Sequence, residues 1–238
     1  MLTHTVGFIY AHPDDETFGC ACLIRSLADQ GVTATLLTAT SGEAGKPGRL
    51  GPMSREELAA RRERELAAAG AIMGLADIEL LRYPDGQLSS VPRRELVEKI
   101  AAFLNRHRAA VVVTFPEGGI SGHPDHIAIH HAVNEAVWSG SCPHVQKLYY
   151  NMPMTVPEAE TDSVIRLEAA PYWEMKAAAL RAHESQILSI ERVFGGDLQT
   201  LPPDERMRGE AFALVWKRGV HRPAVREHSV LDDLHKES

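Results

Sequence analysis

Cysteine is scarce in this sequence, which has only three thiols, Cys20, Cys22 and Cys142, among 238 residues. An odd and small number of cysteines does not suggest a disulfide framework, and it fits a reducing cytoplasm. No basic region precedes the first apolar segment, so we expect no signal peptide and a cytoplasmic protein.

Long apolar runs and basic tracts are missing as well. No apolar run approaches the roughly 18 residues that a membrane-spanning helix needs. The formal net charge is -7, and an acidic chain without a basic tract is a poor partner for nucleic acid or an anionic membrane. We therefore expect a small-molecule ligand, no nucleic acid and no membrane, and we leave a homo-oligomer open.

The sequence does contain short apolar runs that alternate with helical segments. Its 44% of hydrophobic residues suffice for one substantial core, so we predict a single domain over residues 1–238. The polar residues from about 220 to 238 are expected to form a tail or an oligomer arm. Strands are predicted at 5–11, 32–39, 78–82, 109–115, 147–151 and 211–217, and helices at 17–29, 54–73, 93–108, 127–138 and 171–190.

This alternation predicts an α/β fold, a Rossmann-like three-layer sandwich with a mostly parallel sheet. The apolar run at 109–115 is typical of a central strand that is covered on both faces. Ligands of such sheets bind beyond the carboxyl ends of the strands. Two polar motifs follow predicted strands, and we expect them to meet at that edge.

The first motif is AHPDDE at residues 11–16, and the second is HPDH at residues 123–126, after a lead-in that contains Gly118, Gly119 and Gly122. Each places nitrogen and oxygen donors on a short loop. A catalytic zinc site uses three protein ligands and leaves one position for water. Two histidines and one carboxylate from these loops meet that requirement, and they suit ferrous iron as well.

Capping is a plainer interpretation of both motifs. Acidic residues at a helix start complement the helix dipole and bind its free N–H groups. An isolated histidine at such a position is more often a surface or capping residue than a metal ligand. Two His-Pro-Asp tripeptides, each behind a buried strand and beside a further donor, favour the metal site.

The pair of motifs resembles the PIG-L/LmbE-like superfamily of N-acetylglucosaminyl deacetylases in motif order, in position after strands and in the glycine-rich lead-in. The resemblance is strongest over residues 6–85 and 115–136. It implies a zinc-dependent hydrolase, with Zn²⁺ or another divalent metal such as Fe²⁺, that removes an acetyl group from an N-acetylglucosamine-type amino-sugar conjugate.

The resemblance also implies a role for individual residues. The matches to the zinc ligands are His12, Asp15 and His126. Asp14 matches the general base, and His123 matches the residue that stabilises or protonates the tetrahedral intermediate, with Asp125 as its orienting partner. The matches to the lining of the sugar site are Glu43, Arg62, Glu65 and Asp85. Some members carry a tyrosine two residues before the equivalent of His123, where this chain has Ser121. The oxyanion would then be stabilised by zinc and His123, or by a residue that the sequence does not identify.

Chemistry supports these roles independently of the resemblance. Zinc lowers the pKa of a bound water towards about 7 and polarises a carbonyl. Asp14 lies beside a predicted ligand, where it can accept the proton of that water. A carboxylate such as Asp125 can fix the tautomer of a neighbouring histidine.

Two other functions remain open. A metal-free Rossmann-like sugar-nucleotide binding protein would share the fold, but a phosphate binder places glycines where this chain has three carboxylates. The second open function is that of a non-catalytic relative that binds sugar. The presence of Asp14 and of all three predicted metal ligands argues against it. Cys20 and Cys22 cannot share one helix face, and His183 is left open between capping, packing and approach to the site.

Overall fold

The computed structural model describes residues 4–155, 163–202 and 204–235. Its strands form one eight-stranded sheet in the order β3-β2-β1-β4-β5-β7-β6, with β8 paired to β7. The bounds of the strands are β1 (Thr5–Tyr10), β2 (Thr33–Thr40), β3 (Asp77–Tyr83), β4 (Ala109–Thr114), β5 (Lys147–Met152), β6 (Val164–Glu168), β7 (Gly209–Lys217) and β8 (Val220–His221).

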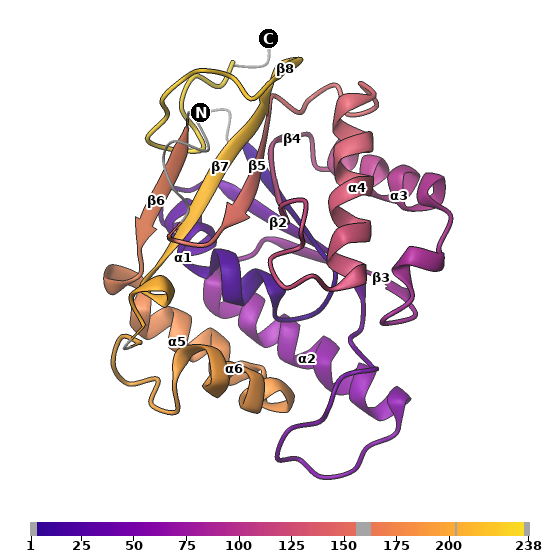
Figure 1. The fold of residues 1–238 in the computed structure, drawn as a ribbon, viewed down its shortest axis with the longest axis vertical. Coiled ribbons are helices and arrows are strands. Elements are labelled where there is room, and N and C mark those ends of the chain that lie inside the picture. The colour runs from indigo at the N-terminus through magenta and orange to yellow at the C-terminus, as the bar shows by residue number, and fades with distance from the viewer. Residues whose placement is uncertain (1–3, 156–162, 203, 236–238) are drawn as a thin grey trace.

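Six helices cover the sheet in the described ranges, and Figure 1 shows α3 and α4 together on one side and α1, α2, α5 and α6 on the other. Their bounds are α1 (Asp15–Asp29), α2 (Arg55–Met73), α3 (Arg93–Arg106), α4 (Pro124–Trp138), α5 (Trp173–Ala182) and α6 (Ile187–Phe194). Strands β1 to β5 pair in parallel, and β6, β7 and β8 pair antiparallel. The predicted three-layer α/β fold with a mostly parallel sheet is confirmed.

The core lies on both faces of β1 and β4. Every residue of β4 is buried, as its apolar sequence predicts for a central strand. The predicted start of α2 is also confirmed in detail. The Ser54 hydroxyl accepts a hydrogen bond from the Glu57 N–H, while the Glu57 carboxylate accepts one from the Ser54 N–H.

The predicted helix at 171–190 is wrong in one respect, since it is two helices with a break at His183. The backbone of His183 leaves the helical region with ψ 59°, and the Ser185 N–H donates to the buried Glu65 carboxylate of α2. This tertiary bond outweighs the local helical pattern. Helix α4 begins at Pro124 rather than at 127, because proline suits the first turn of a helix.

The C-terminal segment lies against β5 and β7 of its own sheet. The buried Lys147 ammonium of β5 donates to the Glu227 carboxylate at 2.9 Å and to the Val230 carbonyl at 3.2 Å. Lys217 of β7 donates to the same carboxylate at 2.8 Å. Residues 220–235, which we expected to be a tail or an oligomer arm, are therefore docked on the sheet, and residues 236–238 lie outside the described residues.

All three cysteines are free and buried, as expected of a fold without a disulfide framework. Across the described ranges, every helix is too short or too polar to cross a membrane.

Candidate metal centre

The two predicted motifs meet at one edge of the sheet. Strands β1 and β4 are parallel neighbours, so the loops that follow them lie side by side. His12 comes two residues after β1, and Asp15 opens α1. His126 lies in the first turn of α4, beyond the loop that follows β4. The topology therefore brings together side chains that are more than a hundred residues apart in the sequence.

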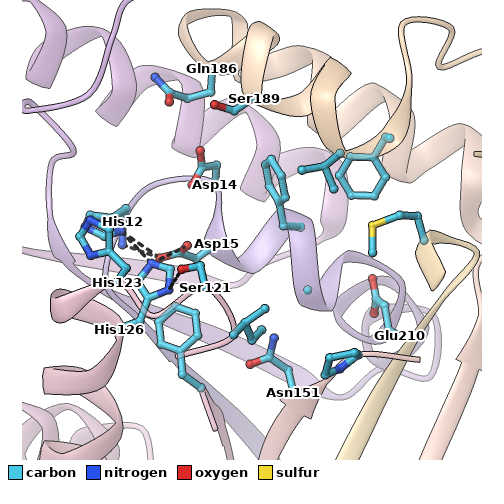
Figure 2. Close-up of a pocket in the computed structure, with 18 of the residues that line it drawn as sticks. His12, Asp14, Asp15, Ser121, His123, His126, Asn151, Gln186, Ser189 and Glu210 are labelled. Carbon is cyan, nitrogen blue, oxygen red and sulfur yellow. Dashed lines mark hydrogen bonds and ion pairs between the residues drawn. The ribbon is translucent and has the colours of Figure 1, made fainter. Parts of the chain in front are cut away.

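Donor atoms of three side chains converge there. His12 Nδ1 lies 3.1 Å from His126 Nε2 and 3.5 Å from Asp15 Oδ2, and His126 Nε2 lies 3.3 Å from Asp15 Oδ1. Donor atoms about 3.3–3.4 Å apart surround a tetrahedral zinc with bonds of roughly 2.0–2.1 Å. These separations fit such an ion, and Figure 2 shows both histidines directed at Asp15.

The other nitrogen of each ring is held by the protein. His12 Nε2 lies 3.0 Å from an Asp85 oxygen and 3.2 Å from an Asp125 oxygen, and His126 Nδ1 lies 2.9 Å from the Gly119 carbonyl. Since these oxygens accept protons from Nε2 and Nδ1, the lone pairs of the two remaining nitrogens face each other. A proton or a metal cation can bridge such a pair beside a carboxylate.

The pKa values also show that the site stabilises positive charge. Burial lowers the pKa of His12, but the hydrogen bonds that its ring donates to Asp125, Asp15 and Asp85 outweigh burial and raise the pKa to about 12. Burial raises the pKa of Asp15, but the charges of His126 and His12 and their hydrogen bonds bring it below its usual value. A divalent cation would take the place of the shared protons.

Two compact groups of possible metal ligands in the described residues share His12. One adds His123 and His126, the other adds Asp85 and Asp125, and neither contains Asp15. The rings of His12 and His123 lie 4.7 Å apart. Asp85 and Asp125 face the far nitrogen of His12, and both already accept backbone N–H groups.

Asp14 stands beside this cluster in a strained backbone conformation. Its φ is 113°, a value that costs a non-glycine residue energy and is retained where the surroundings impose it. Asp14 precedes α1 without capping it through its carboxylate, so the capping interpretation does not account for this side chain. Burial is the main reason that its pKa rises to about 6, against the lowering effect of the Arg62 charge.

The Arg62 side chain connects the loop after β1 to the loop after β2, and its guanidinium is engaged by both. Its guanidinium donates to the Gly42 carbonyl at 2.9 Å, to the Pro13 carbonyl, and to Asp14 Oδ2 at 3.2 Å. Gly42 has φ 70°, and a Cβ there would lie 2.3 Å from the guanidinium. Arg62 also lines the cavity described below, and its contact with a sugar stays a prediction.

The other predicted sugar-site residues differ in position. Asp85 lines the cavity and binds His12. Glu43 accepts the Asp85 N–H at 2.8 Å and is absent from the lining in the described residues. Glu65 also lies away from the lining, because its carboxylate holds Arg61 and Ser185.

The predicted hydrogen bond between the side chains of Asp125 and His123 is replaced by others. The buried Asp125 carboxylate accepts hydrogen bonds from the Gly86 N–H at 2.7 Å and the Leu88 N–H at 3.0 Å, besides that from His12. His123 Nδ1 instead accepts the backbone N–H of Asp125 at 3.2 Å, which leaves the ring proton on Nε2. Burial, followed by the charges of His12 and His126, lowers the pKa of His123.

Sequence reasoning missed the part played by Glu16, the last residue of the first motif. Glu16 is fully buried and accepts the Asp14 N–H at 3.2 Å. His183, also fully buried, lies behind it, with Nε2 3.4 Å from Glu16 and 3.1 Å from the Thr17 hydroxyl. His183 is thus buried against the first motif and, among the described residues, makes no side-chain capping hydrogen bond at the end of α5.

A cavity of about 580 Å³ opens from this cluster. Ser121 lines it, 3.5 Å from His126 Nδ1, where some family members have a tyrosine. Figure 2 shows His12, His123 and His126 at one side and Asn151 and Glu210 at the other. The lining residues that sequence reasoning did not single out include Phe18, Asn151, Met154, Gln186, Ser189, Val193, Phe194, Met207 and Glu210. They come from distant segments and carry no shared motif.

Comparisons with known proteins identify the family of the chain. The family described as GlcNAc-PI de-N-acetylase (PIG-L) matches residues 8–137. A protein of Kineococcus radiotolerans, named 1D-myo-inositol 2-acetamido-2-deoxy-alpha-D-glucopyranoside deacetylase, is 33% identical over 90% of this chain and 76% of its own length.

Two solved structures share the fold. N,N'-diacetylchitobiose deacetylase from Pyrococcus horikoshii has a TM-score of 0.66 at 22% identity, over 90% of this chain and 84% of that one. GalB, a 4-carboxy-2-hydroxymuconate hydratase from Pseudomonas putida, has a TM-score of 0.67 at 18% identity, over 93% and 100%. The fold thus hosts more than one reaction, and the sequence match decides between them: the chain belongs to the GlcNAc-PI de-N-acetylase (PIG-L) family.

Proposed function

We propose that this protein is a hydrolase that removes the acetyl group of an N-acetylglucosamine-type amino sugar, with a divalent metal held by His12, Asp15 and His126. One observation supports this most directly. Donor atoms of His12, Asp15 and His126 lie 3.1–3.5 Å apart in pairs, with a different Asp15 oxygen facing each histidine. The two rings are held from behind by Asp85, Asp125 and the Gly119 carbonyl, and the Asp14 carboxylate, which caps no helix, lies beside them.

The chemistry that a metal supplies when bound is polarisation of the acetyl carbonyl and a lowered pKa of the attacking water. Zinc and ferrous iron both suit two histidines and a carboxylate. Asp85 and Asp125 would keep the Nδ1 lone pair of His12 directed at the ion, and the Gly119 carbonyl would do the same for His126 Nε2.

The remaining steps belong to residues of this chain. The Asp14 carboxylate accepts a proton from the attacking water, whose oxygen bonds to the acetyl carbon. The sugar nitrogen takes up the proton that Asp14 holds as the C–N bond breaks, which releases the amine and acetic acid. The acid then loses its proton to solvent at neutral pH. The pKa of Asp14, raised to about 6 mainly by burial, suits a group that both accepts and returns a proton near neutral pH.

His123 would stabilise the oxyanion of the tetrahedral intermediate. Because Nδ1 accepts the Asp125 N–H, Nε2 carries the proton and is a hydrogen-bond donor. The lowered pKa of His123 favours this neutral donor over a charged acid. Arg62 positions Asp14, and with Asp85 it is placed to contact the sugar, while Glu43 supports Asp85.

A combined metal and activity assay tests this function. Purified protein should retain about one divalent metal per chain and release amine from an N-acetylglucosamine conjugate. Asp14→Asn should keep the metal and lose activity by roughly a hundredfold or more, the scale of a lost general base. His126→Ala should lose most of the metal. Asp29→Asn, at the exposed far end of α1, and His131→Ala, in the same helix as His126, are the matched controls.

Two results would overturn the proposal. Near-normal turnover by Asp14→Asn with its metal retained would remove Asp14 from the reaction, and a full equivalent of metal in His126→Ala would refute the ligand set. Metal-free wild-type protein that binds sugar nucleotide would favour the alternative binding function. The buried free thiols support a reducing compartment such as the cytoplasm. Three expectations stay predictions: a homo-oligomer, no nucleic-acid partner and no membrane partner.

A further inference from the structure

The cavity extends away from His12, Asp15 and His126, between α1, α6 and the segments that flank β6 and β7. We call this part the apolar arm and define it by Phe18, Met154, Val193, Phe194 and Met207, which line the cavity. Between the histidines and Glu210, Figure 2 draws mostly carbon atoms and one sulfur. The arm thus differs chemically from the end that carries the histidines and carboxylates.

The walls of the apolar arm are held in place by a second hydrophobic cluster beneath α5 and α6. Phe194 is buried in this cluster, with its ring 5.3 Å from that of Phe18 and 6.2 Å from that of Trp173. Phe18, Val193 and Met207 pack against the same cluster and are only half-buried. Their remaining apolar surface faces the cavity, as expected of a largely preformed binding pocket.

Polar groups near the apolar arm are mostly engaged by the protein. The Glu210 carboxylate accepts the Lys176 ammonium at 2.7 Å and the N–H groups of Cys22 and Leu23. Arg206 is paired with Asp204. In the described lining, the Gln186 amide donates to the Lys46 carbonyl and the Ser185 hydroxyl, and Asn151 and Ser189 are further uncharged groups for a ligand. A polyol ring, with a hydroxyl on nearly every carbon, would leave many of those hydroxyls without a partner, which is costly.

We infer that the apolar arm binds an alkyl or aryl aglycone, so that the preferred substrate is an amphiphilic N-acetylglucosaminide whose acetyl group reaches the metal cluster. This inference rests on the proposed function, because the arm and the cluster share one cavity. It separates this chain from relatives whose names specify an inositol conjugate.

Three probes test the inference with the metal-loaded protein: free N-acetylglucosamine, its hexyl glycoside and its inositol conjugate. We expect kcat/KM for the hexyl glycoside to exceed both others by about tenfold or more, which corresponds to burial of a few methylene groups. Val193→Asn should lower kcat/KM for the hexyl glycoside by about tenfold, mainly by raising KM. It should change kcat/KM for the free sugar by less than about twofold. Leu188→Asn is the matched control, since Leu188 lies in the same helix, is 49% exposed and is not part of the lining.

Met207→Gln, on another wall of the arm, provides a second variant if Val193→Asn folds poorly. Equal values for the hexyl and inositol conjugates, or equal effects of both arm variants on all three probes, would overturn the inference and leave the deacetylase function intact. If none of the probes is hydrolysed, the proposed function fails. Calorimetry can then still measure the affinity of the hexyl glycoside for the apolar arm. An affinity that Val193→Asn and Met207→Gln leave unchanged would refute the inference.

Discussion

The Oδ2 atom of Asp125 lies 3.2 Å from Nε2 of His12, so a carboxylate of the second motif holds a histidine of the first. The same carboxylate accepts the N–H groups of Gly86 and Leu88 from the loop after β3. Three loops at one sheet edge are thus joined through one buried side chain. Asp125 contacts the predicted metal ligand His12 directly and His123 only through its backbone N–H.

Asp125→Asn should therefore weaken metal binding. An amide accepts the hydrogen bond from Nε2 of His12 less strongly than a carboxylate does, so Nδ1 of His12 becomes a weaker metal ligand. Loss of such a supporting carboxylate costs about 10–100-fold in metal affinity. Competition with a chelator of known affinity measures the effect. Glu135→Gln, an exposed change in the same helix, should leave the affinity unchanged. Unaltered metal affinity in Asp125→Asn, together with a shifted pH profile, would instead restore Asp125 as the partner of His123.

The sequence was sufficient to predict the parts of this molecule that depend on local patterns. The apolar run of β4, the capping box of Ser54 and Glu57 and the two motifs are all written in consecutive residues. The parallel-sheet rule then placed the motifs at one edge, and β1 and β4 are indeed neighbours. The convergence of His12, Asp15 and His126 follows from this topology.

The sequence could not predict which distant side chains would pair. Glu43 was expected at the sugar, yet it accepts the Asp85 N–H, because two loops pack against each other there. Glu227 pairs with Lys147 from 80 residues away. Sequence spacing predicts neither of these contacts. It also does not predict the walls of the apolar arm, where Phe18 and Phe194 come together only in the folded chain.

Arg62→Gln should move the rising limb of the pH–rate profile to higher pH, if Asp14 is the base. The Arg62 charge lowers the pKa of Asp14, which burial raises to about 6. Without that charge the pKa rises further, and the ionised base appears only at higher pH. Each unit of displacement lowers the rate on the acid side by about tenfold. Rates from pH 4.5 to 8 would show this, and Arg61→Gln, which loses the bond to Glu65 instead, should leave the limb in place. A fixed limb in Arg62→Gln would contradict the role of Asp14.

Glu227→Gln should destabilise the fold by about 3–5 kcal/mol, the cost of breaking a buried ion pair from one side. Its carboxylate holds the buried Lys147 and the Lys217 ammonium and accepts the Tyr149 hydroxyl, so the change leaves positive charge buried without a counter-ion. Urea unfolding measures the loss. Asp233→Asn, whose side chain is 66% exposed, removes a surface partner of Lys217 and should cost less than about 1 kcal/mol. Equal losses in both variants would mean that the C-terminal segment is not anchored through Glu227.

The Cys142 thiol should make the protein less stable as pH rises from about 9 to 11. Burial raises the pKa of this thiol to about 11 in the folded state, whereas an unfolded cysteine has a pKa near 8.5. Between these values the unfolded chain has already lost the proton that the folded chain keeps, so unfolding releases a proton and rising pH favours it. At pH 10.5 this contribution amounts to about 2 kcal/mol relative to pH 8.

Cys142→Ala removes that contribution and keeps a small buried side chain. Its free energy of unfolding, measured in urea under reducing conditions, should therefore lie below that of the wild type at pH 8 because of the lost packing, and the difference should shrink or reverse by about 2 kcal/mol at pH 10.5. Ser141→Ala, next in the chain and exposed, should keep a constant difference from the wild type. Since the other buried thiols and tyrosines remain in both proteins, their alkaline titration cancels in the comparison. A difference between Cys142→Ala and wild type that is the same at both pH values would show that this thiol ionises as easily in the folded chain as in the unfolded one.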